Sequence, residues 1–352
     1  MSARDRLCES LAKHAEEAAA WKSPMYSAFA TAMRRDVEAG GPTWNLLEPY
    51  ADEPADEYYA FRALAAVHHQ VIAGELPELA KHYPSVGGDG DAEAAWPLVR
   101  ERFAAHSPEV LATLRHPLQT NETARCGALI GGFLVAARDT GLALRVREVG
   151  SSAGLNLHFD RYRYEAVGRA FGPADSPVRF VDHWEGGAPP FDVPMEIASR
   201  RGCDLDPIDA TSEDGRLSLL SYIFCDQMPR YELLREAIEV ARAYPVTVDR
   251  ESLDEWAARE LADPPDGEAT IVFHSLVWIY LPEDVRRRTR SVFEAAAEAA
   301  DVRRPFGWLC YELDPDLLRC ELRLTLWPGG EDRLLGRGDV HLAPVEWLEE
   351  DR

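Results

Sequence analysis

The chain has 352 residues, which is enough for one large domain or two ordinary ones. It carries 38 Lys and Arg against 61 Asp and Glu, a formal net charge of -23, and so acidic a surface repels nucleic acids and anionic membranes. No apolar run approaches the roughly 18–20 residues of a membrane span, and residues 1–17 lack the apolar core of a signal peptide. The six cysteines are scattered, with no CxxC pair and no histidine at metal spacing. We therefore expect a cytoplasmic protein with reduced thiols and no metal, nucleic-acid or membrane partner.

Residues 1–140 are predicted to form a helical domain. Ser23 followed by Pro24 is a helix cap with proline at the first helical position, and apolar residues then recur on one face as far as Gly40. Similar helical patterns cover 56–73, 96–114 with an interruption at Pro108, and 121–140. No strand is indicated before residue 142.

From residue 142 the pattern alternates between strands and helices. Apolar or alternating segments predict strands at 142–149, 196–204, 244–249, 268–282 and 305–315, and an antiparallel hairpin at 320–347. Helical patterns lie between several of these strands, as at 231–244 and after Pro282. Such alternation predicts a mostly parallel sheet covered by helices, here over 141–352, with an insertion at about 162–190. The terminal hairpin on such a sheet is the layout of class I methyltransferases.

A glycine turn follows the first predicted strand, in the sequence EVGSSAGLNL. Glu148 stands two residues before Gly150, and Gly154 completes the pattern acidic-x-Gly-x-x-x-Gly, which is typical of the first motif of methyltransferases. The carboxylate of Glu148 can accept hydrogen bonds from the ammonium of S-adenosylmethionine, and glycines allow the backbone to approach a ligand closely. Ser151 and Asn156 are further candidates for cofactor contact.

A second acidic position is expected at the end of the next strand, where it would bind the ribose hydroxyls. The sequence CDLDP offers Asp204, with Asp206 as its rival. A compact fold reaches that position in about 20 residues, so the longer distance here requires an insertion between them.

The same turn permits two other interpretations. A dinucleotide site needs G-x-G-x-x-G, and Ser152 stands where that motif has its second glycine. The sequence GSSAG also matches the G-x-S-x-G elbow of serine hydrolases, with Ser152 as nucleophile, Asp204 or Asp226 as the acid and His274 as the base. Hydrolase elbows follow several sheet strands, whereas this one follows a long helical region. A protein that binds the cofactor without catalysis is a further alternative.

Two groups of polar residues are candidates for the substrate side. His274 and Ser275 lie within the strongest strand pattern, and His274 is the candidate general base because its ordinary pKa is near 6.5; the structural alternative is a hydrogen-bonded strand-end histidine. A polar cluster before the last helix of the helical domain is a candidate lid element, although one such residue suffices for a helix cap. The members of the cluster proposed for substrate contact are Gln119, Asn121, Glu122 and Arg125.

The segments EVGSSAGLNLHFDRYRY, CDLDPID, DQMPR, VFHSLVWIYLP and QTNETARC resemble an uncharacterised bacterial family, a domain of unknown function with a methyltransferase-like sheet. The resemblance spans nearly the whole chain, and it implies the fold predicted above without implying a substrate. Members of that family often carry Gly-Asp-Ala after the third strand, which would place an acid near the adenine, whereas this chain has Asp249-Arg250-Glu251 there. Together, the motifs and the resemblance predict S-adenosylmethionine-dependent methyl transfer to a small molecule.

Overall fold

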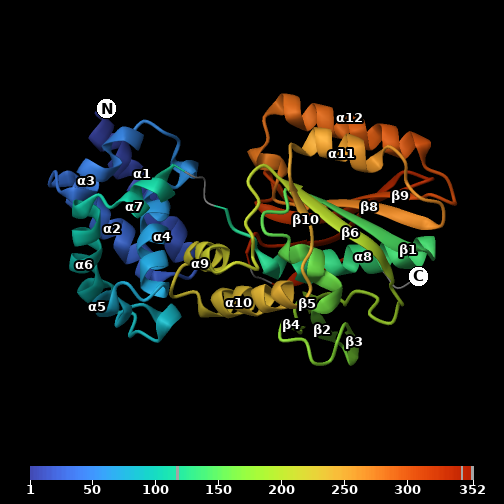
Figure 1. Ribbon diagram of the computed structural model, residues 1–352, viewed down its shortest axis with the longest axis horizontal. Coiled ribbons are helices and arrows are strands. Elements are labelled where there is room, and N and C mark those ends of the chain that lie inside the picture. Colours follow the sequence, from blue (N-terminus) through green and yellow to red (C-terminus); the bar gives the residue numbers. More distant parts are fainter. Residues whose placement is uncertain (116–118, 342–343, 350–352) are drawn as a thin grey trace. The chain divides into compact units, whose positions relative to one another are not determined.

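The computed structural model describes residues 1–115, 119–341 and 344–349. These residues divide into two compact units (Figure 1). The helical unit comprises Met1–Thr120 and Ser212–Glu232, and the α/β unit comprises Asn121–Thr211 and Leu233–Arg352. The helical domain expected from the sequence extended to residue 140. In the structure, the helix at 126–140 belongs to the α/β unit instead.

The helical unit contains the helices predicted at its N-terminus. Its helices are α1 (Ala3–Ala20), α2 (Pro24–Glu38), α3 (Pro42–Leu47), α4 (Tyr59–Ile72), α5 (Pro77–Ala80), α6 (Ala92–Ala105), α7 (Pro108–Leu114) and α9 (Glu213–Ser221). Short 3₁₀ turns lie at Glu48–Tyr50, Ala55–Glu57 and Pro84–Val86. Helix α10 (Met228–Ala243) crosses the boundary between the units. The predictions for α2 and α4 are confirmed, as is the break before Pro108.

Residues 212–232 join the helical unit through contacts that span about two hundred positions of sequence. Asp226 accepts hydrogen bonds from the Ser23 hydroxyl at 2.5 Å and from the backbone N–H of Met25 at 2.8 Å, at the start of α2. Phe224 stacks on Tyr26 with 4.1 Å between ring centroids. Asp226, one of the two acids considered for a hydrolase, is therefore engaged at a helix start.

His68 on α4 gives the helical unit an expected pH dependence. Its ring is buried, Nδ1 donates to the carbonyl of Ser221 at 3.1 Å, and Nε2 accepts from the Ser85 hydroxyl at 2.7 Å. Burial lowers the pKa of His68 from 6.5 to about 4. Below pH 6.5 the unfolded chain therefore binds a proton that the folded chain refuses, and stability falls as the pH drops toward 4.

We expect His68 to account for a loss of about 2 kcal/mol in unfolding free energy between pH 7 and pH 4.5. Urea titrations of the wild type and of His68→Gln, followed by far-UV circular dichroism, give the unfolding free energy at each pH. The contribution of His68 is the difference between the two proteins in the slope of unfolding free energy against pH. His69→Gln on the same helix is the control and should keep the wild-type slope. Equal slopes for wild type and His68→Gln would contradict the assignment.

The α/β unit is built on a mixed sheet. In the described residues the sheet has nine strands in the order β5-β12-β11-β10-β9-β8-β1-β6-β7. The strands are β1 (Ala143–Val149), β5 (Trp184–Glu185), β6 (Ile197–Asp204), β7 (Val248–Arg250), β8 (Glu268–Ser275), β9 (Phe306–Asp314), β10 (Arg319–Trp327), β11 (Glu331–Gly338) and β12 (Val345–Trp347). Strands β7, β6, β1, β8 and β9 are parallel neighbours, and β10 and β11 form the antiparallel hairpin predicted from the sequence. The predicted α/β class is thus confirmed.

The order of the parallel strands reverses at β1. The chain runs from β1 outward through β6 to β7, and then returns to place β8 and β9 on the other side of β1. In open α/β sheets, ligands bind outside the carboxyl ends of the strands at such a switch point. The turn after β1 lies at this position.

Helices cover both faces of the parallel strands. Helix α8 (Cys126–Thr140) packs against one face, where Phe133 meets Phe273 of β8. Helices α11 (Leu253–Leu261) and α12 (Glu283–Ala299) cover the other face, with Trp256 and Phe293 in a core that includes Val272 (Figure 1). Side chains of successive strand residues therefore alternate between an α8 face and an α11–α12 face.

Residues 163–181, within the expected insertion, form a small separate sheet. It consists of β2 (Arg163–Ala166), β3 (Arg169–Phe171) and β4 (Arg179–Val181), in the order β3-β2-β4. A 3₁₀ segment at Leu155–Arg161 precedes it, directly after the glycine turn.

Strand β8 is shorter than its sequence pattern predicted. The apolar run continues to Pro282, but the strand ends at Ser275 because Leu276 takes a left-handed conformation with φ of 50°. A 3₁₀ turn at Trp278–Tyr280 follows, and Trp278 folds back to stack on the His274 ring. In the described part of the chain, no helix is long and apolar enough to cross a membrane.

Candidate functional site

The turn after β1 needs glycine at two positions. Gly150 and Gly154 have φ angles of 72° and 74°, which residues with a side chain rarely adopt. A Cβ atom at Gly150 would stand 2.6 Å from a methyl group of Val277, and one at Gly154 would stand 2.8 Å from a methyl group of Val248. The space beside both glycines is thus filled by the protein itself, and chain packing accounts for both.

Backbone hydrogen bonds anchor this turn to the end of β6. The N–H groups of Gly150 and Ser151 both donate to the carbonyl of Cys203, each at 2.9 Å. The N–H of Ser152 donates to a carboxylate oxygen of Asp204 at 2.8 Å. The other oxygen of Asp204 accepts the N–H of Asp206 at 3.0 Å. Both oxygens of the Asp204 carboxylate thus accept backbone N–H groups and hold the turn after β1 and the segment after β6 together.

Glu148, at the end of β1, is a buried carboxyl group beside this turn. Its side chain is only 2% exposed, and its Oε2 atom has no hydrogen-bond partner among the described residues. Burial raises the pKa of Glu148 well above its ordinary value, and the nearby charge of Asp204 raises it further. Side-chain hydrogen bonding by Ser151 and Asn156 opposes this rise in the pKa of Glu148. The structure therefore brings four of the predicted cofactor residues together: Glu148, Ser151, Asn156 and Asp204.

Asn156 and Asn121 connect the turn to the segment before α8. The thiol of Cys126 donates to the Asn156 side-chain oxygen at 3.2 Å. The side-chain oxygen of Asn121 accepts the N–H of Leu155 at 2.9 Å, immediately after Gly154. Asn121 thus holds the end of the turn from outside, a role that its sequence position alone did not indicate.

The remaining residues of the predicted lid cluster separate into two groups. Arg125 donates to the carbonyl of Ser275 at 2.8 Å, and it lies near the Ser275 hydroxyl at 3.5 Å. The carboxylate of Glu122 lies 3.5 Å from the ring of His341. These residues are at the carboxyl end of β8, near the switch point, whereas Gln119 belongs to the helical unit.

His274 lies on the sheet face opposite Glu148. Glu148 pairs in register with Phe273, whose side chain faces α8, so the next residue faces α11 and α12. The ring of His274 is 1% exposed and stacks on Trp278 with 4.4 Å between centroids. Its Nδ1 lies 2.6 Å from a carboxylate oxygen of Glu312, and its Nε2 accepts the indole N–H of Trp308 at 2.9 Å. Both ring nitrogens are thus engaged within the protein.

Glu312, on β9, was not singled out from the sequence. The oxygen that faces His274 also accepts the N–H groups of Val277 and Trp278, at 2.9 and 3.2 Å. Burial alone would raise the pKa of Glu312, but the histidine and the two N–H groups outweigh it and hold that pKa below its ordinary value. The sequence signal that could have identified Glu312 is the presence of an acidic residue inside the apolar run PFGWLCYELDP.

The contacts of Ser152 do not assemble a hydrolase relay. Ser152 has φ of 54°, and its buried hydroxyl has no hydrogen-bond partner among the described residues. The candidate base His274 is bound to Glu312 and Trp308, and a carboxylate oxygen of the candidate acid Asp204 accepts the backbone N–H of Ser152.

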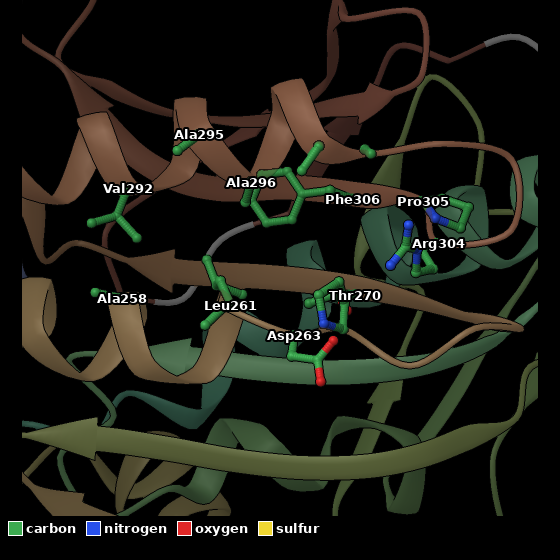
Figure 2. Close-up of a pocket in the computed structure, with 14 residues that line it drawn as sticks. Ala258, Leu261, Asp263, Thr270, Val292, Ala295, Ala296, Arg304, Pro305 and Phe306 are labelled. Carbon is green, nitrogen blue, oxygen red and sulfur yellow. The ribbon is translucent and has the colours of Figure 1, made fainter.

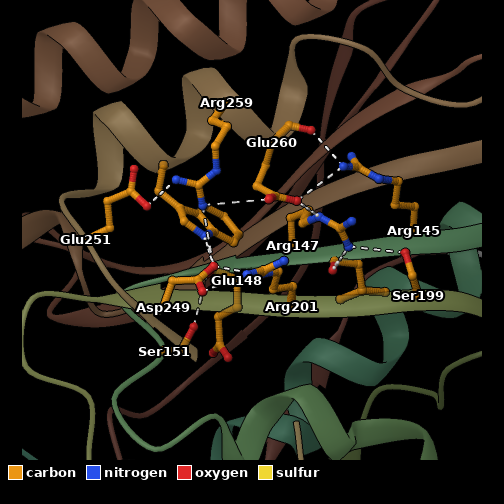
Figure 3. Close-up of polar contacts among 12 residues, drawn as sticks. Arg145, Arg147, Glu148, Ser151, Ser199, Arg201, Asp249, Glu251, Arg259 and Glu260 are labelled. Atoms are coloured by element: carbon orange, nitrogen blue, oxygen red, sulfur yellow. Dashed lines mark hydrogen bonds and ion pairs between the residues drawn. The ribbon is translucent and has the colours of Figure 1, made fainter. Parts of the chain in front are cut away.

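A buried network of arginines lies behind the turn, on the α11–α12 face (Figure 3). Arg145 and Arg147 of β1 both reach the carboxylate of Glu260 on α11, at 3.3 and 2.8 Å. Arg201 of β6 forms a two-bond pair with Asp249 at 2.6 and 2.8 Å. The alternation Arg145-x-Arg147 within a buried strand was the sequence signal of this network. Asp249 is therefore paired with Arg201.

Comparison with known proteins identifies a family without identifying a function. No curated protein matches the chain in sequence. A family model described as "Uncharacterized protein conserved in bacteria (DUF2332)" matches residues 8–347, nearly the whole chain. The chain therefore belongs to this uncharacterised bacterial family, DUF2332.

Proposed function

We propose that the α/β unit binds S-adenosylmethionine at the turn after β1 and transfers its methyl group to a small molecule. The fold implied is methyltransferase-like: parallel strands in the order β7-β6-β1-β8-β9, followed by the antiparallel hairpin β10–β11. The observation that carries the proposal is Glu148, a buried carboxyl group with an oxygen that has no hydrogen-bond partner among the described residues, at the switch point of this sheet.

The unpartnered oxygen of Glu148 suits the ammonium group of the cofactor. A buried acceptor without a partner costs about 1–3 kcal/mol, and a cationic donor would both satisfy the oxygen and stabilise its charge. Asp204, at the carboxyl end of the neighbouring strand β6, is the carboxylate we assign to the ribose hydroxyls. Ser151 and Asn156 lie beside Glu148, and Gly150 and Gly154 fix the shape of the turn.

The cofactor itself supplies an activated methyl group on a sulfonium, so the protein has to position the acceptor in line and take up its proton. We assign no proton transfer to His274, because accepting a proton at Nε2 would break its bond from Trp308. His274 with Glu312 instead fixes the end of β8. Substrate contact falls to the residues around that end: Ser275, Arg125 and Glu122.

Asp204→Asn tests the site. We expect the variant to bind S-adenosylmethionine about tenfold more weakly in calorimetry, because one charge-assisted hydrogen bond contributes about 1.5–3 kcal/mol. Asp206→Asn is the matched control: its side chain pairs with Arg250 at the surface, so its affinity should stay within a factor of two of the wild type. Equal losses in both variants, or no binding by the wild type, would contradict the proposed site.

Two further measurements separate the alternatives. Transfer of a labelled methyl group to a metabolite extract distinguishes an enzyme from a protein that only binds the cofactor. A serine-reactive phosphonate, followed by mass spectrometry, should leave Ser152 unlabelled. Labelling of Ser152 that the Ser152→Ala variant abolishes would favour the hydrolase.

A further inference from the structure

A cavity of about 360 Å³ lies in the α/β unit, away from the glycine turn (Figure 2). It is bounded by α11, α12 and the first residues of β8 and β9, which are at the amino-terminal edge of the parallel strands. The turn after β1 is at the opposite, carboxyl edge. Most of the lining is apolar, including Leu261, Val292, Ala296 and Phe306. A volume of this size falls at the lower end of the range for small-molecule sites, about 300–1,000 Å³.

One polar group in this cavity has no partner. Thr270 of β8 lines the cavity, its side chain is 2% exposed, and its hydroxyl makes no hydrogen bond to any described residue. A hydroxyl can donate one hydrogen bond and accept two. Apolar walls around a few polar groups are the usual composition of a ligand pocket, in which the polar groups orient the ligand.

The charge at the rim favours a cation. Arg304 lines the cavity, but its guanidinium is already paired with Asp266 at 3.4 Å and Asp301 at 3.5 Å. Asp263 also lines it, is exposed, and makes no ion pair with any described residue. The uncompensated charge at the rim is thus negative, as is the net charge of the whole chain. An anionic ligand would meet this carboxylate at close range.

We propose that this cavity binds a small amine, with its apolar body between α11 and α12 and its ammonium group at the Asp263 rim. The unpartnered hydroxyl of Thr270 is a second polar contact for the ligand. This site is independent of the proposed methyl-transfer site, because the two lie at opposite edges of the sheet.

Calorimetry on the full chain with three probes of equal length tests the charge preference: hexylamine, hexan-1-ol and hexanoate. We expect hexylamine to bind about two- to fivefold more tightly than hexan-1-ol, the factor appropriate to one exposed ion pair, and hexanoate to bind most weakly. Asp263→Asn should make the amine and the alcohol bind equally. Glu298→Gln, at an exposed position of α12 that does not line the cavity, is the control and should retain the preference for the amine.

Ala296→Leu tests the location, since the added side chain fills the cavity and should abolish binding of all three probes. Circular dichroism verifies that Ala296→Leu is folded. If Ala296→Leu does not fold, Asp263→Asn still tests the proposal, because it changes only a surface residue. Saturation with S-adenosylmethionine should leave hexylamine affinity unchanged. Undiminished binding by folded Ala296→Leu, an unchanged amine preference in Asp263→Asn, or hexanoate affinity equal to that of hexylamine would each overturn the proposal.

Discussion

Replacement of Glu148 by glutamine is expected to stabilise the ligand-free protein and to weaken its binding of S-adenosylmethionine. The folded state holds the pKa of Glu148 well above 4.5, chiefly through burial, so folding favours the protonated carboxyl. The stability it contributes is therefore present below pH 4.5 and is lost as the pH rises through the raised pKa. Above the ordinary pKa, folding therefore requires either uptake of a proton or burial of a charge at Glu148, and a neutral amide of the same shape removes that cost.

We expect Glu148→Gln to gain about 1–3 kcal/mol in unfolding free energy at pH 8, the usual cost of an unsatisfied buried group, and close to nothing at pH 4. Urea titrations at the two pH values measure the gain. Glu294→Gln, at an exposed position of α12, is the control and should change neither value by more than about 0.5 kcal/mol.

Binding should change in the opposite direction. Loss of a charged acceptor for the ammonium group is expected to weaken S-adenosylmethionine binding by about tenfold or more. A variant that is more stable at pH 8 and binds the cofactor as well as the wild type would remove Glu148 from the site while leaving its electrostatics intact. A variant less stable at pH 8 would show that the carboxylate is satisfied in the folded protein.

The opposite signs are informative about why the residue is there. A buried carboxyl group with one unsatisfied oxygen contradicts the local rules of folding, and such conflicts are expected where function rather than stability selects the residue. A glutamate kept only for packing would show no such exchange of stability for affinity. The two measurements therefore test a functional role without knowledge of the acceptor substrate.

The sequence predicted the parts of the fold that depend on local pattern. Strands β8 and β9 are largely apolar, as expected of parallel strands that are buried on both faces, and the Pro-Gly-Gly turn predicted the hairpin of β10 and β11. Residues 212–232 could not be assigned to the helical unit, because their position depends on contacts such as that of Asp226 with Ser23. Local periodicity carries no information about such distant partners.

The candidate site was predicted in part for the same reason. Glu148 and Asp204 each lie at the carboxyl end of a strand, and parallel neighbours bring these ends to one edge of the sheet. The face to which His274 points depends on the register of β8 against β1, which places Phe273 rather than His274 beside Glu148. Glu312 was missed because its partner is 38 residues away along the chain. The residue type of His274 suggested its chemistry, but only the pairing of strands decides which side chains meet.

Glu260→Gln is expected to have the largest effect on stability. Glu260 on α11 is the shared counter-ion of Arg145 and Arg147, and the side chains of all three are about nine-tenths buried (Figure 3). Burial lowers the pKa of Arg147 to about 10, with the nearby charge of Arg145 contributing, so Arg147 remains charged at neutral pH. Glutamine keeps the shape of the side chain and removes the carboxylate charge that the two arginines share. Loss of one partner from a buried ion pair costs about 3–5 kcal/mol.

Urea titration at pH 7 measures this loss, and Glu255→Gln, at an exposed position of the same helix, is the matched control with an expected change below about 0.5 kcal/mol. The cause is isolated by repeating Glu260→Gln in an Arg147→Met background. Methionine fills a similar volume without charge, so fewer buried cations then depend on Glu260, and the substitution should cost at least about 1 kcal/mol less than in the wild type. An equal cost in both backgrounds would mean that Glu260 stabilises α11 by some means other than its charge.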